Sequence, residues 1–242
     1  MSFDAFAKLD VLAIGAHRDD VEITCGGTVI KLVDLGYKVG ILDLTQGEMG
    51  TKGTADQRGK EAQGAAKVMG ISVRENLRLP DSNVENTLEN KLKLVKIIRK
   101  YKPHLVILPY WTQRHPDHLR CSQLGYEACY LSGLAKLKVS GEPHRPFKII
   151  YSSSFFEEKH SFIVDISEQF ERKIEAVKCY KSQFGELLKK KKVHPFPRNV
   201  FDFMEIKARQ YGYLIGKKYG EAFITKELLE VEDPMKLLVR SI

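Results

Sequence analysis

The sequence has no apolar run of the length that a membrane span requires. Its apolar stretches are short, such as those at 11–16 and 105–109, whereas a transmembrane helix needs about 18 or more consecutive apolar residues. The N-terminal segment carries an acid at position 4 and no apolar stretch of signal-peptide length, which argues against export. We therefore expect a cytoplasmic protein with no membrane partner.

Cysteine pairs, repeats and flexible linkers are also lacking. The four cysteines never form a CxxC pair, and a chain of 242 residues does not need disulfides to fold, so we expect reduced thiols. No Ser/Gly-rich segment divides the chain, and the weakest seams are 138–147 and 185–199. The sequence predicts one domain over 1–242, in which 1–135 carries the site and 136–242 covers or extends it.

Positive charge exceeds negative charge. Lys and Arg number 39 against 31 Asp and Glu, a formal charge of +8, which suits an anionic substrate, an anionic surface or nucleic acid alike. The densest basic run, Lys189 to Lys192, lies beside prolines, and we expect it to form a solvated loop. No recognisable nucleic-acid motif accompanies it, so we expect no nucleic-acid partner, and a salt-dependent gel shift would test that alternative.

Short apolar runs alternate with longer amphipathic stretches. We expect strands at 11–15, 39–44, 77–79 and 105–108, with helices between them at about 22–36, 56–69 and 87–101. Two further strands at 149–153 and 162–164 precede helices near 167–181 and 201–218. This order predicts an α/β fold of Rossmann-like type, with a mostly parallel sheet, helices on both faces and ligands at the carboxyl ends of the strands.

The glycine fingerprint of dinucleotide-binding enzymes is absent. After the first expected strand the chain runs GAHRDD, where a nicotinamide-dependent enzyme would have GxGxxG. A dinucleotide-dependent oxidoreductase is therefore disfavoured, although it would share the sheet.

Ligand-type side chains follow the first and fourth expected strands instead. His17 and Asp20 are three residues apart where the chain turns from strand to helix, and His118 follows the fourth strand. Two imidazoles and one carboxylate form a known catalytic zinc set that leaves a position open for water or substrate. Asp19 and His115 are their neighbours, and an acid or base beside such water is what hydrolysis requires.

Each of these residues also has an alternative explanation. Asp19, Asp20 and Asp117 lie near expected helix N-termini, where carboxylates cap free amides without any catalytic role. The coincidence of three ligand-type residues at adjacent strand ends favours the metal site. A protein with a purely structural zinc ion would keep the metal without turnover.

Several motifs resemble those of the PIG-L/LmbE-type zinc-dependent N-deacetylases. They are AHRDDVE (16–22), GTADQRGKEA (53–62), LPD (79–81) and HPDH (115–118), in that order. YKSQF (180–184) and YGEAF (219–223) extend the resemblance toward the bacterial N-acetylglucosaminyl-malate deacetylases of bacillithiol synthesis. Arg18 stands where this family usually has Pro, at a position that supplies no metal ligand.

The resemblance implies a role for each matching residue. It places one zinc ion per chain on His17, Asp20 and His118, with Asp19 as general base. His115 is expected to stabilise the tetrahedral oxyanion or to donate a proton. Asp117 of the HPDH motif is a further catalytic candidate. Arg58 and Asp81 are expected to bind the sugar, unless they form a structural Arg–Asp pair, and Arg114 is expected to meet an acidic aglycone such as malate.

The expected reaction is removal of the acetyl group from N-acetylglucosaminyl-L-malate. A broader deacetylase of N-acetylglucosamine or chitin fragments is the alternative within the family. We expect a small-molecule sugar conjugate as the partner that binds the site. The resemblance also implies that the chain forms a homo-oligomer, a trimer or a hexamer.

Overall fold

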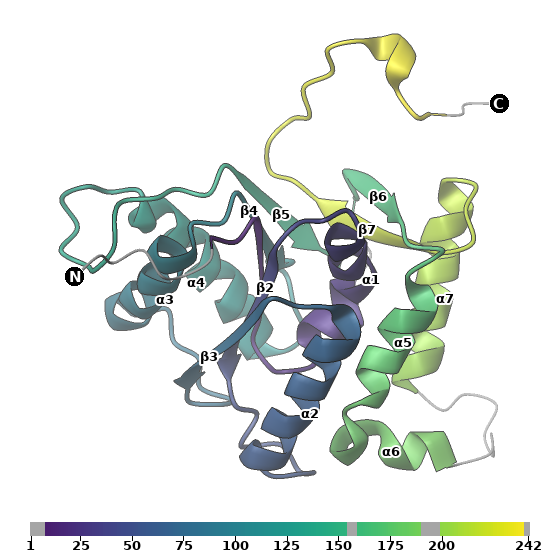
Figure 1. Ribbon diagram of the computed structural model, residues 1–242, viewed down its shortest axis with the longest axis horizontal. Coiled ribbons are helices and arrows are strands. Elements are labelled where there is room, and N and C mark those ends of the chain that lie inside the picture. Colours follow the sequence, from purple (N-terminus) through teal and green to yellow (C-terminus); the bar gives the residue numbers. More distant parts are fainter. Residues whose placement is uncertain (1–7, 154–158, 190–198, 240–242) are drawn as a thin grey trace.

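The computed structural model describes residues 8–153, 159–189 and 199–239 (Figure 1). Helices and strands alternate through its first half as the sequence predicts. The strands are β1 Val11–Gly15, β2 Val39–Thr45, β3 Val73–Leu79, β4 Leu105–Pro109, β5 Lys148–Ser152, β6 Phe162–Asp165 and β7 Gly220–Ile224. The helices are α1 Asp20–Asp34, α2 Ala55–Met69, α3 Leu88–Tyr101, α4 Pro116–Ser132, α5 Phe170–Lys178, α6 Lys181–Lys189 and α7 Val200–Leu214.

All seven strands belong to one sheet in the order β3-β2-β1-β4-β5-β7-β6. The pairs from β3 to β5 are parallel, and β7 runs antiparallel to both β5 and β6. The chain moves outward from β1 to β3, then crosses back to place β4 on the other side of β1. The carboxyl ends of β1 and β4 therefore flank the topological switch point, which is where open α/β sheets bind ligands.

Each face of the sheet is buried under helices. Successive side chains of a strand point to opposite faces, so Leu12 and Ile14 of β1 pack with α3 and α4, while Val11 and Ala13 pack with α1, α2 and α5. Figure 1 shows α3 and α4 on one side of the sheet and α1, α2, α5 and α7 on the other. The single α/β domain with helices on both faces is confirmed.

Local sequence signals set several helix ends. Thr54 and Thr87 cap α2 and α3, because each hydroxyl accepts a hydrogen bond from the backbone N–H three residues later. α2 ends at Gly70, whose φ of 76° is a left-handed conformation that glycine adopts without steric cost. α4 begins with Pro116, a residue suited to the first helical turn.

The expected elements differ from the structure in five places, one of which is the helix expected near 201–218, which ends at Leu214. β3 begins at Val73 rather than 77, because its polar residues lie on an edge strand, where side chains are only partly buried. β7 was not expected as a strand, since it contains a glycine and a glutamate. α4 was not given a range, and the stretch near 167–181 divides into α5 and the start of α6. Most of the basic run from Lys189 to Lys192 lies outside the described residues.

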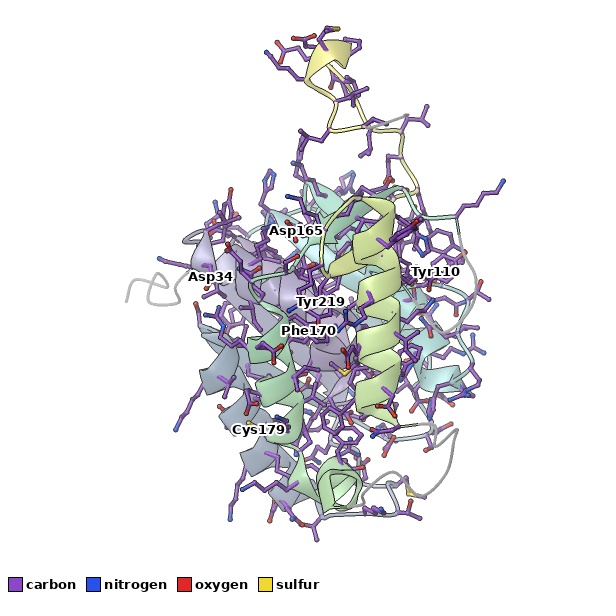
Figure 2. The ribbon with its side chains drawn as sticks, turned by 90° about the vertical axis from the view of Figure 1, so that its right-hand side faces the viewer. Asp34, Tyr110, Asp165, Phe170, Cys179 and Tyr219 are labelled. Atoms are coloured by element: carbon purple, nitrogen blue, oxygen red, sulfur yellow. The ribbon has the colours of Figure 1, made fainter. Side chains whose placement is uncertain are left out.

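Beyond β7 the chain leaves the body of the molecule. Residues 225–239 extend away from the sheet and contain one short 3₁₀ turn, Pro234–Lys236, as Figures 1 and 2 both show. We call this segment the C-terminal arm. Within the described ranges no helix has the length and apolarity to cross a membrane, and the cytoplasmic location stays a prediction.

Candidate active site

The residues expected to bind a metal come together at the switch point of the sheet. His17 lies just after β1, Asp20 is the first residue of α1, and His118 lies in the first turn of α4. The β1–α1 and β4–α4 connections are neighbours because β1 and β4 pair in the sheet. The fold thus brings residues 101 positions apart into contact.

Their ligand atoms form a small triangle. His17 Nδ1 lies 3.2 Å from His118 Nε2 and 3.4 Å from Asp20 Oδ2, and His118 Nε2 lies 3.2 Å from Asp20 Oδ1. A tetrahedral ion with bonds of about 2.0–2.2 Å holds its ligand atoms roughly 3.3–3.6 Å apart. The spacing and the donor set of two imidazoles and one carboxylate therefore fit a catalytic zinc site.

The second ring nitrogen of His17 faces two more carboxylates. His17 Nε2 lies 3.1 Å from Asp81 Oδ1 and 3.4 Å from Asp117 Oδ2. Because these oxygens accept hydrogen bonds, they hold a proton on Nε2 and leave Nδ1 as the nitrogen that faces Asp20 and His118. A carboxylate behind a ligating histidine in this way fixes the ring orientation.

The charges of the site favour a cation. Burial opposes a positive charge on His17, but the charge of Asp20 and hydrogen bonds with Asp117, Asp20 and Asp81 raise the pKa of His17 to about 12. Burial alone would raise the pKa of Asp20, yet His118 and His17 hold it well below its usual range. A proton on His17 occupies the place that a metal ion would take, so metal and proton compete for this site.

A second trio, His17, His115 and Asp117, also has ligand atoms close together. It is the poorer candidate because both carboxylate oxygens of Asp117 already accept backbone N–H groups, whereas only Oδ2 of Asp20 does. Asp117 Oδ1 accepts the backbone N–H of Val84 at 3.2 Å, and Oδ2 accepts that of Ser82 at 2.8 Å. Asp117 therefore connects the loop after β3 to the start of α4 beneath the site.

Asp19 lies beside the triangle and is paired with an arginine. Arg58 Nη2 donates to Asp19 Oδ1 at 3.3 Å, and both side chains are largely buried. Burial raises the pKa of Asp19, as does the nearby charge of Asp20, while Arg58 and His17 lower it in part. A carboxylate with a raised pKa is a better proton acceptor at neutral pH than an ordinary one.

His115 caps α4 with its side chain. Its Nδ1 accepts the backbone N–H of Asp117 at 3.2 Å, so the neutral ring carries its proton on Nε2. The ring centroid lies 4.9 Å from that of His17 and 5.0 Å from that of His118. Burial lowers the pKa of His115, and the charges of His17 and His118 lower it further. The neutral ring is a hydrogen-bond donor through Nε2.

Comparison with known proteins identifies the chain. Residues 12–129 match the PIG-L family, described as GlcNAc-PI de-N-acetylase. Diacetylchitobiose deacetylase of Thermococcus kodakarensis is 32% identical over 230 residues, which cover 87% of this chain and 80% of that protein. The chain belongs to the PIG-L family.

This PIG-L deacetylase is also similar to solved structures. The conserved protein TT1542 of Thermus thermophilus is 36% identical, with a TM-score of 0.84 over 93% of this chain and 98% of that one. N,N'-diacetylchitobiose deacetylase of Pyrococcus horikoshii is 30% identical, with a TM-score of 0.75 over 91% of this chain and 84% of that one.

The residues expected to bind substrate are spread around this site. Arg58 pairs with Asp19 rather than with Asp81, and its Nη1 also donates to the carbonyl of Gly47 at 2.9 Å. Both oxygens of Asp81 have protein partners, His17 Nε2 at 3.1 Å and the backbone N–H of Met49 at 2.8 Å. Arg114 is exposed at the surface next to His115. The substrate roles of all three stay predictions.

A buried ionic network supports the loop between β1 and α1, and the sequence analysis missed it. Arg74 of β3 donates to Asp43 Oδ1 and Oδ2 at 2.9 Å each, to Glu22 Oε1 at 2.6 Å, and to the carbonyl of Arg18. Tyr180 donates to Glu22 Oε1 at 2.7 Å and to the same carbonyl. Two members of this network lie in motifs that the sequence analysis named, Glu22 in AHRDDVE and Tyr180 in YKSQF, and these motifs were the sequence signals that could have indicated it.

Arg18, the residue that departs from the usual Pro, reaches away from the site. Its Nη1 donates to the carbonyl of Ala55 at the start of α2, and a Cβ on Gly59 would meet the same nitrogen at 2.9 Å. Arg18 therefore ties the loop after β1 to α2, while its carbonyl receives the hydrogen bonds of Arg74 and Tyr180.

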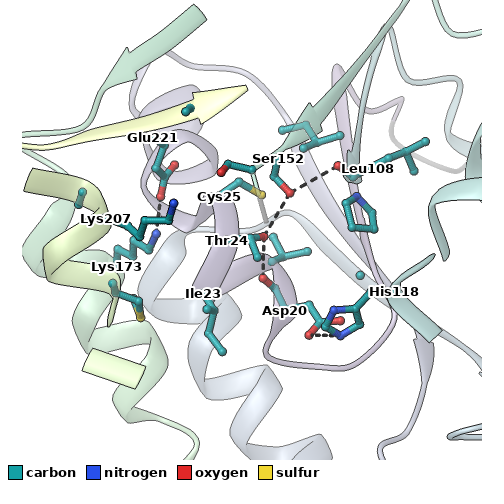
Figure 3. A pocket seen from close by; sticks show the side chains of 18 of the residues that line it. Asp20, Ile23, Thr24, Cys25, Leu108, His118, Ser152, Lys173, Lys207 and Glu221 are labelled. Carbon is teal, nitrogen blue, oxygen red and sulfur yellow. Dashed lines mark hydrogen bonds and ion pairs between the residues drawn. The ribbon is translucent and has the colours of Figure 1, made fainter. Parts of the chain in front are cut away.

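A cavity behind the candidate metal ligands was also not expected. It extends from Asp20 and His118 toward α5, α7 and β7, and Lys173, Lys207 and Glu221 line its inner end (Figure 3). These charged residues come from the last third of the sequence, where Glu221 belongs to the YGEAF motif and no motif includes Lys173 or Lys207.

Proposed function

We propose that this PIG-L deacetylase removes the acetyl group of an N-acetylglucosaminyl conjugate, releasing a free amine and acetate. N-acetylglucosaminyl-L-malate is the proposed substrate. The observation that carries the proposal is the triangle of His17, Asp20 and His118 with Asp19 directly beside it. Water adds to the acetyl carbonyl carbon, the C–N bond breaks, and the amine nitrogen gains a proton.

His17, Asp20 and His118 are the proposed ligands of one zinc ion per chain. When bound there, zinc supplies a Lewis acid that polarises the amide carbonyl and lowers the pKa of water. Asp81 and Asp117 orient His17 by accepting from its Nε2.

Asp19 is the proposed general base. Its carboxylate accepts the proton of the attacking water and returns it to the amine nitrogen as the C–N bond breaks. Arg58 holds the carboxylate in place through its 3.3 Å hydrogen bond. The pKa of Asp19, raised by burial, favours this exchange near neutral pH.

His115 is the proposed donor to the developing oxyanion. Its Nε2–H is held by the hydrogen bond that Nδ1 accepts from the backbone of Asp117, so a neutral ring can stabilise negative charge without reorganising. Arg58, Asp81 and Arg114 are proposed to contact the substrate, with Arg114 meeting a carboxylate of the aglycone.

Deacetylation of chitin fragments is the second candidate activity. It is supported by the two relatives named diacetylchitobiose deacetylase, which are 32% and 30% identical to this chain. The malate conjugate carries carboxylates and diacetylchitobiose is neutral, so substitution of Arg114 distinguishes the two candidate substrates. Arg114→Ala should lower kcat/KM for the malate conjugate about tenfold to a hundredfold, and leave that for diacetylchitobiose little changed.

The deciding experiment measures metal content and acetate release on a panel of N-acetylglucosaminyl conjugates. His17→Ala, Asp20→Ala and His118→Ala should each lose zinc and activity together. Full zinc and full turnover in all three variants would overturn the site. Acetate release from diacetylchitobiose alone would replace the malate proposal by the second activity, and so would turnover of both substrates with a ratio of kcat/KM values that Arg114→Ala leaves unchanged.

We also propose that the protein is a homo-oligomer, a trimer or a hexamer. The C-terminal arm supports this proposal, because Leu228 is 99% exposed, Met235 91% and Leu238 103%. The arm carries four acidic residues and two lysines, whereas the whole chain has a formal charge of +8. An acidic, apolar arm is opposite in charge to a second copy of this chain, whose formal net charge is positive.

A further inference from the structure

The cavity behind the candidate metal ligands has two different ends. At one end Asp20 and His118 present their side chains, and at the other end Lys173 and Lys207 lie near Glu221 (Figure 3). Thr24 and Ser152 lie between them, and their hydroxyl oxygens are 3.4 Å apart. A molecule released at the metal site can therefore meet a cationic group without leaving the protein.

One of the two lysines is fully matched. Lys173 Nζ lies 2.5 Å from Glu221 Oε1, and both side chains are buried. Glu221 also accepts the backbone N–H groups of Gly27 at 2.9 Å and Thr28 at 2.6 Å. It does so because α1 breaks its helical geometry at Cys25, which creates a new helix N-terminus that a carboxylate stabilises.

The other lysine has no such carboxylate. Among the described residues, Lys207 Nζ donates to the hydroxyl of Tyr211 at 3.0 Å and forms no ion pair. An ammonium group has three N–H donors, and Tyr211 is a neutral partner that also lies 2.8 Å from Ser153 Oγ. With Glu221 matched by Lys173, the inner end of the cavity has an excess positive charge on Lys207.

The size of the cavity limits what it can hold. About 50 Å³ is open to the centre of a water-sized sphere, and one water needs roughly 10–15 Å³ of such space. The cavity therefore has room for roughly three to five water molecules, which suits an acetate ion and excludes a sugar ring.

We propose that this cavity binds a small carboxylate, with the Lys207 ammonium as its cation. The identity of the carboxylate rests on the proposed function, which supplies two sources. One is the acetate that deacetylation releases, which the cavity volume favours. The other is a carboxylate on the aglycone of the substrate, reaching in from the metal site.

The first experiment measures acetate binding to the zinc-loaded protein by titration calorimetry at fixed ionic strength. Lys207→Met should weaken acetate binding about tenfold to a hundredfold, because a charge-assisted hydrogen bond is lost. Lys207→Arg should retain most of the affinity. Lys178→Met is the matched control, since Lys178 is on α5 and pairs with Glu175 at the surface. Acetamide, the neutral analogue, should bind weakly to all four proteins.

The second experiment separates the two sources. If the carboxylate belongs to the aglycone, Lys207→Met leaves acetate affinity unchanged and lowers kcat/KM for the malate conjugate at least tenfold relative to diacetylchitobiose. Either result supports a carboxylate site at Lys207. Acetate affinity within twofold of wild type, together with an unchanged substrate ratio, overturns the proposal.

The calorimetric experiment needs no turnover, so it separates this proposal from the proposed function. Acetate binding that depends on Lys207, in a protein that deacetylates no conjugate, would uphold the site and reject the reaction. Should Lys207→Met fail to fold by circular dichroism, Lys207→Gln replaces it, because glutamine keeps a polar side chain at this partly exposed position.

Discussion

The two ring nitrogens of His17 have different partners, and this difference defines the site at the residue scale. Nε2 faces Asp81 and Asp117, and Nδ1 faces Asp20 and His118. Three carboxylates around one imidazole are stable only when the site holds a positive charge, either a proton or a metal ion. The three carboxylates thus explain both the proposed binding of a metal ion and the raised pKa of His17 in the metal-free site.

Asp19→Asn should retain zinc and lose most of the rate. The amide keeps nearly the same shape but cannot accept a proton, and a general base contributes about a hundredfold to ten-thousandfold. Measurement of kcat with metal content on the same sample checks this. An unchanged kcat would leave Asp19 as the structural partner of Arg58.

Metal affinity should fall as the pH falls. The pKa of His17 in the metal-free protein is raised to about 12, so at neutral pH a metal ion must displace a proton from this ring. The apparent dissociation constant should rise about tenfold for each pH unit lowered between about pH 8 and pH 6, and more steeply where His118 also protonates. Competition with a chelating dye measures it, and a constant that does not change with pH would contradict the assignment of His17.

At the scale of elements, the short connection between β1 and α1 is held in place from behind. Arg74 lies on β3, two strands away from β1, and reaches Asp43 on β2 and the carbonyl of Arg18 in the connection. Glu22 and Tyr180 extend the same network to α1 and to the start of α6. Every partner is buried or nearly so, and removal of one charge leaves the others unmatched.

Arg74→Met should therefore destabilise the protein by about 3–5 kcal/mol. Urea unfolding of the zinc-loaded protein measures the loss, and turnover should fall as well because the Arg18 carbonyl loses a donor. Lys67→Met, an exposed position on α2, is the control and should change stability little. A loss below about 1 kcal/mol in Arg74→Met would show that the network contributes little.

At the scale of the whole molecule, the C-terminal arm exposes apolar side chains that one copy of the chain does not cover. Its leucines and Met235 lie in solvent, whereas the two main apolar clusters of the described chain lie buried, one on each face of the sheet. A segment of this kind gains stability by packing against another surface.

The double substitution Met235→Asp with Leu238→Asp should lower the oligomeric state. Sedimentation should give a mass above 27.6 kDa for the wild type and a smaller mass for the variant, because charged residues in an apolar interface are costly. Lys236→Gln, which changes an exposed polar residue of the same arm, should keep the wild-type mass. Equal masses for wild type and double variant would remove the arm from the interface.

The sequence by itself determined the fold class, the presence and order of the first four strands, and the set of candidate metal ligands. It could do so because those features are local: apolar runs indicate buried strands, and polar side chains directly after parallel strands meet at one edge of the sheet. His17, Asp20 and His118 were singled out in this way, and the fold brings them together, while their role as metal ligands stays a prediction.

Only the tertiary structure decided what each remaining polar residue contacts. Asp81 faces His17, Arg58 pairs with Asp19, and Arg74 links β3 and β2 to the β1–α1 connection. Each contact joins segments far apart in the chain. β7 was hidden for the same reason: Glu221 is buried there by its pairing with Lys173 and with the broken α1 helix. Burial of charge depends on partners that only the folded chain brings together, and no local pattern records them.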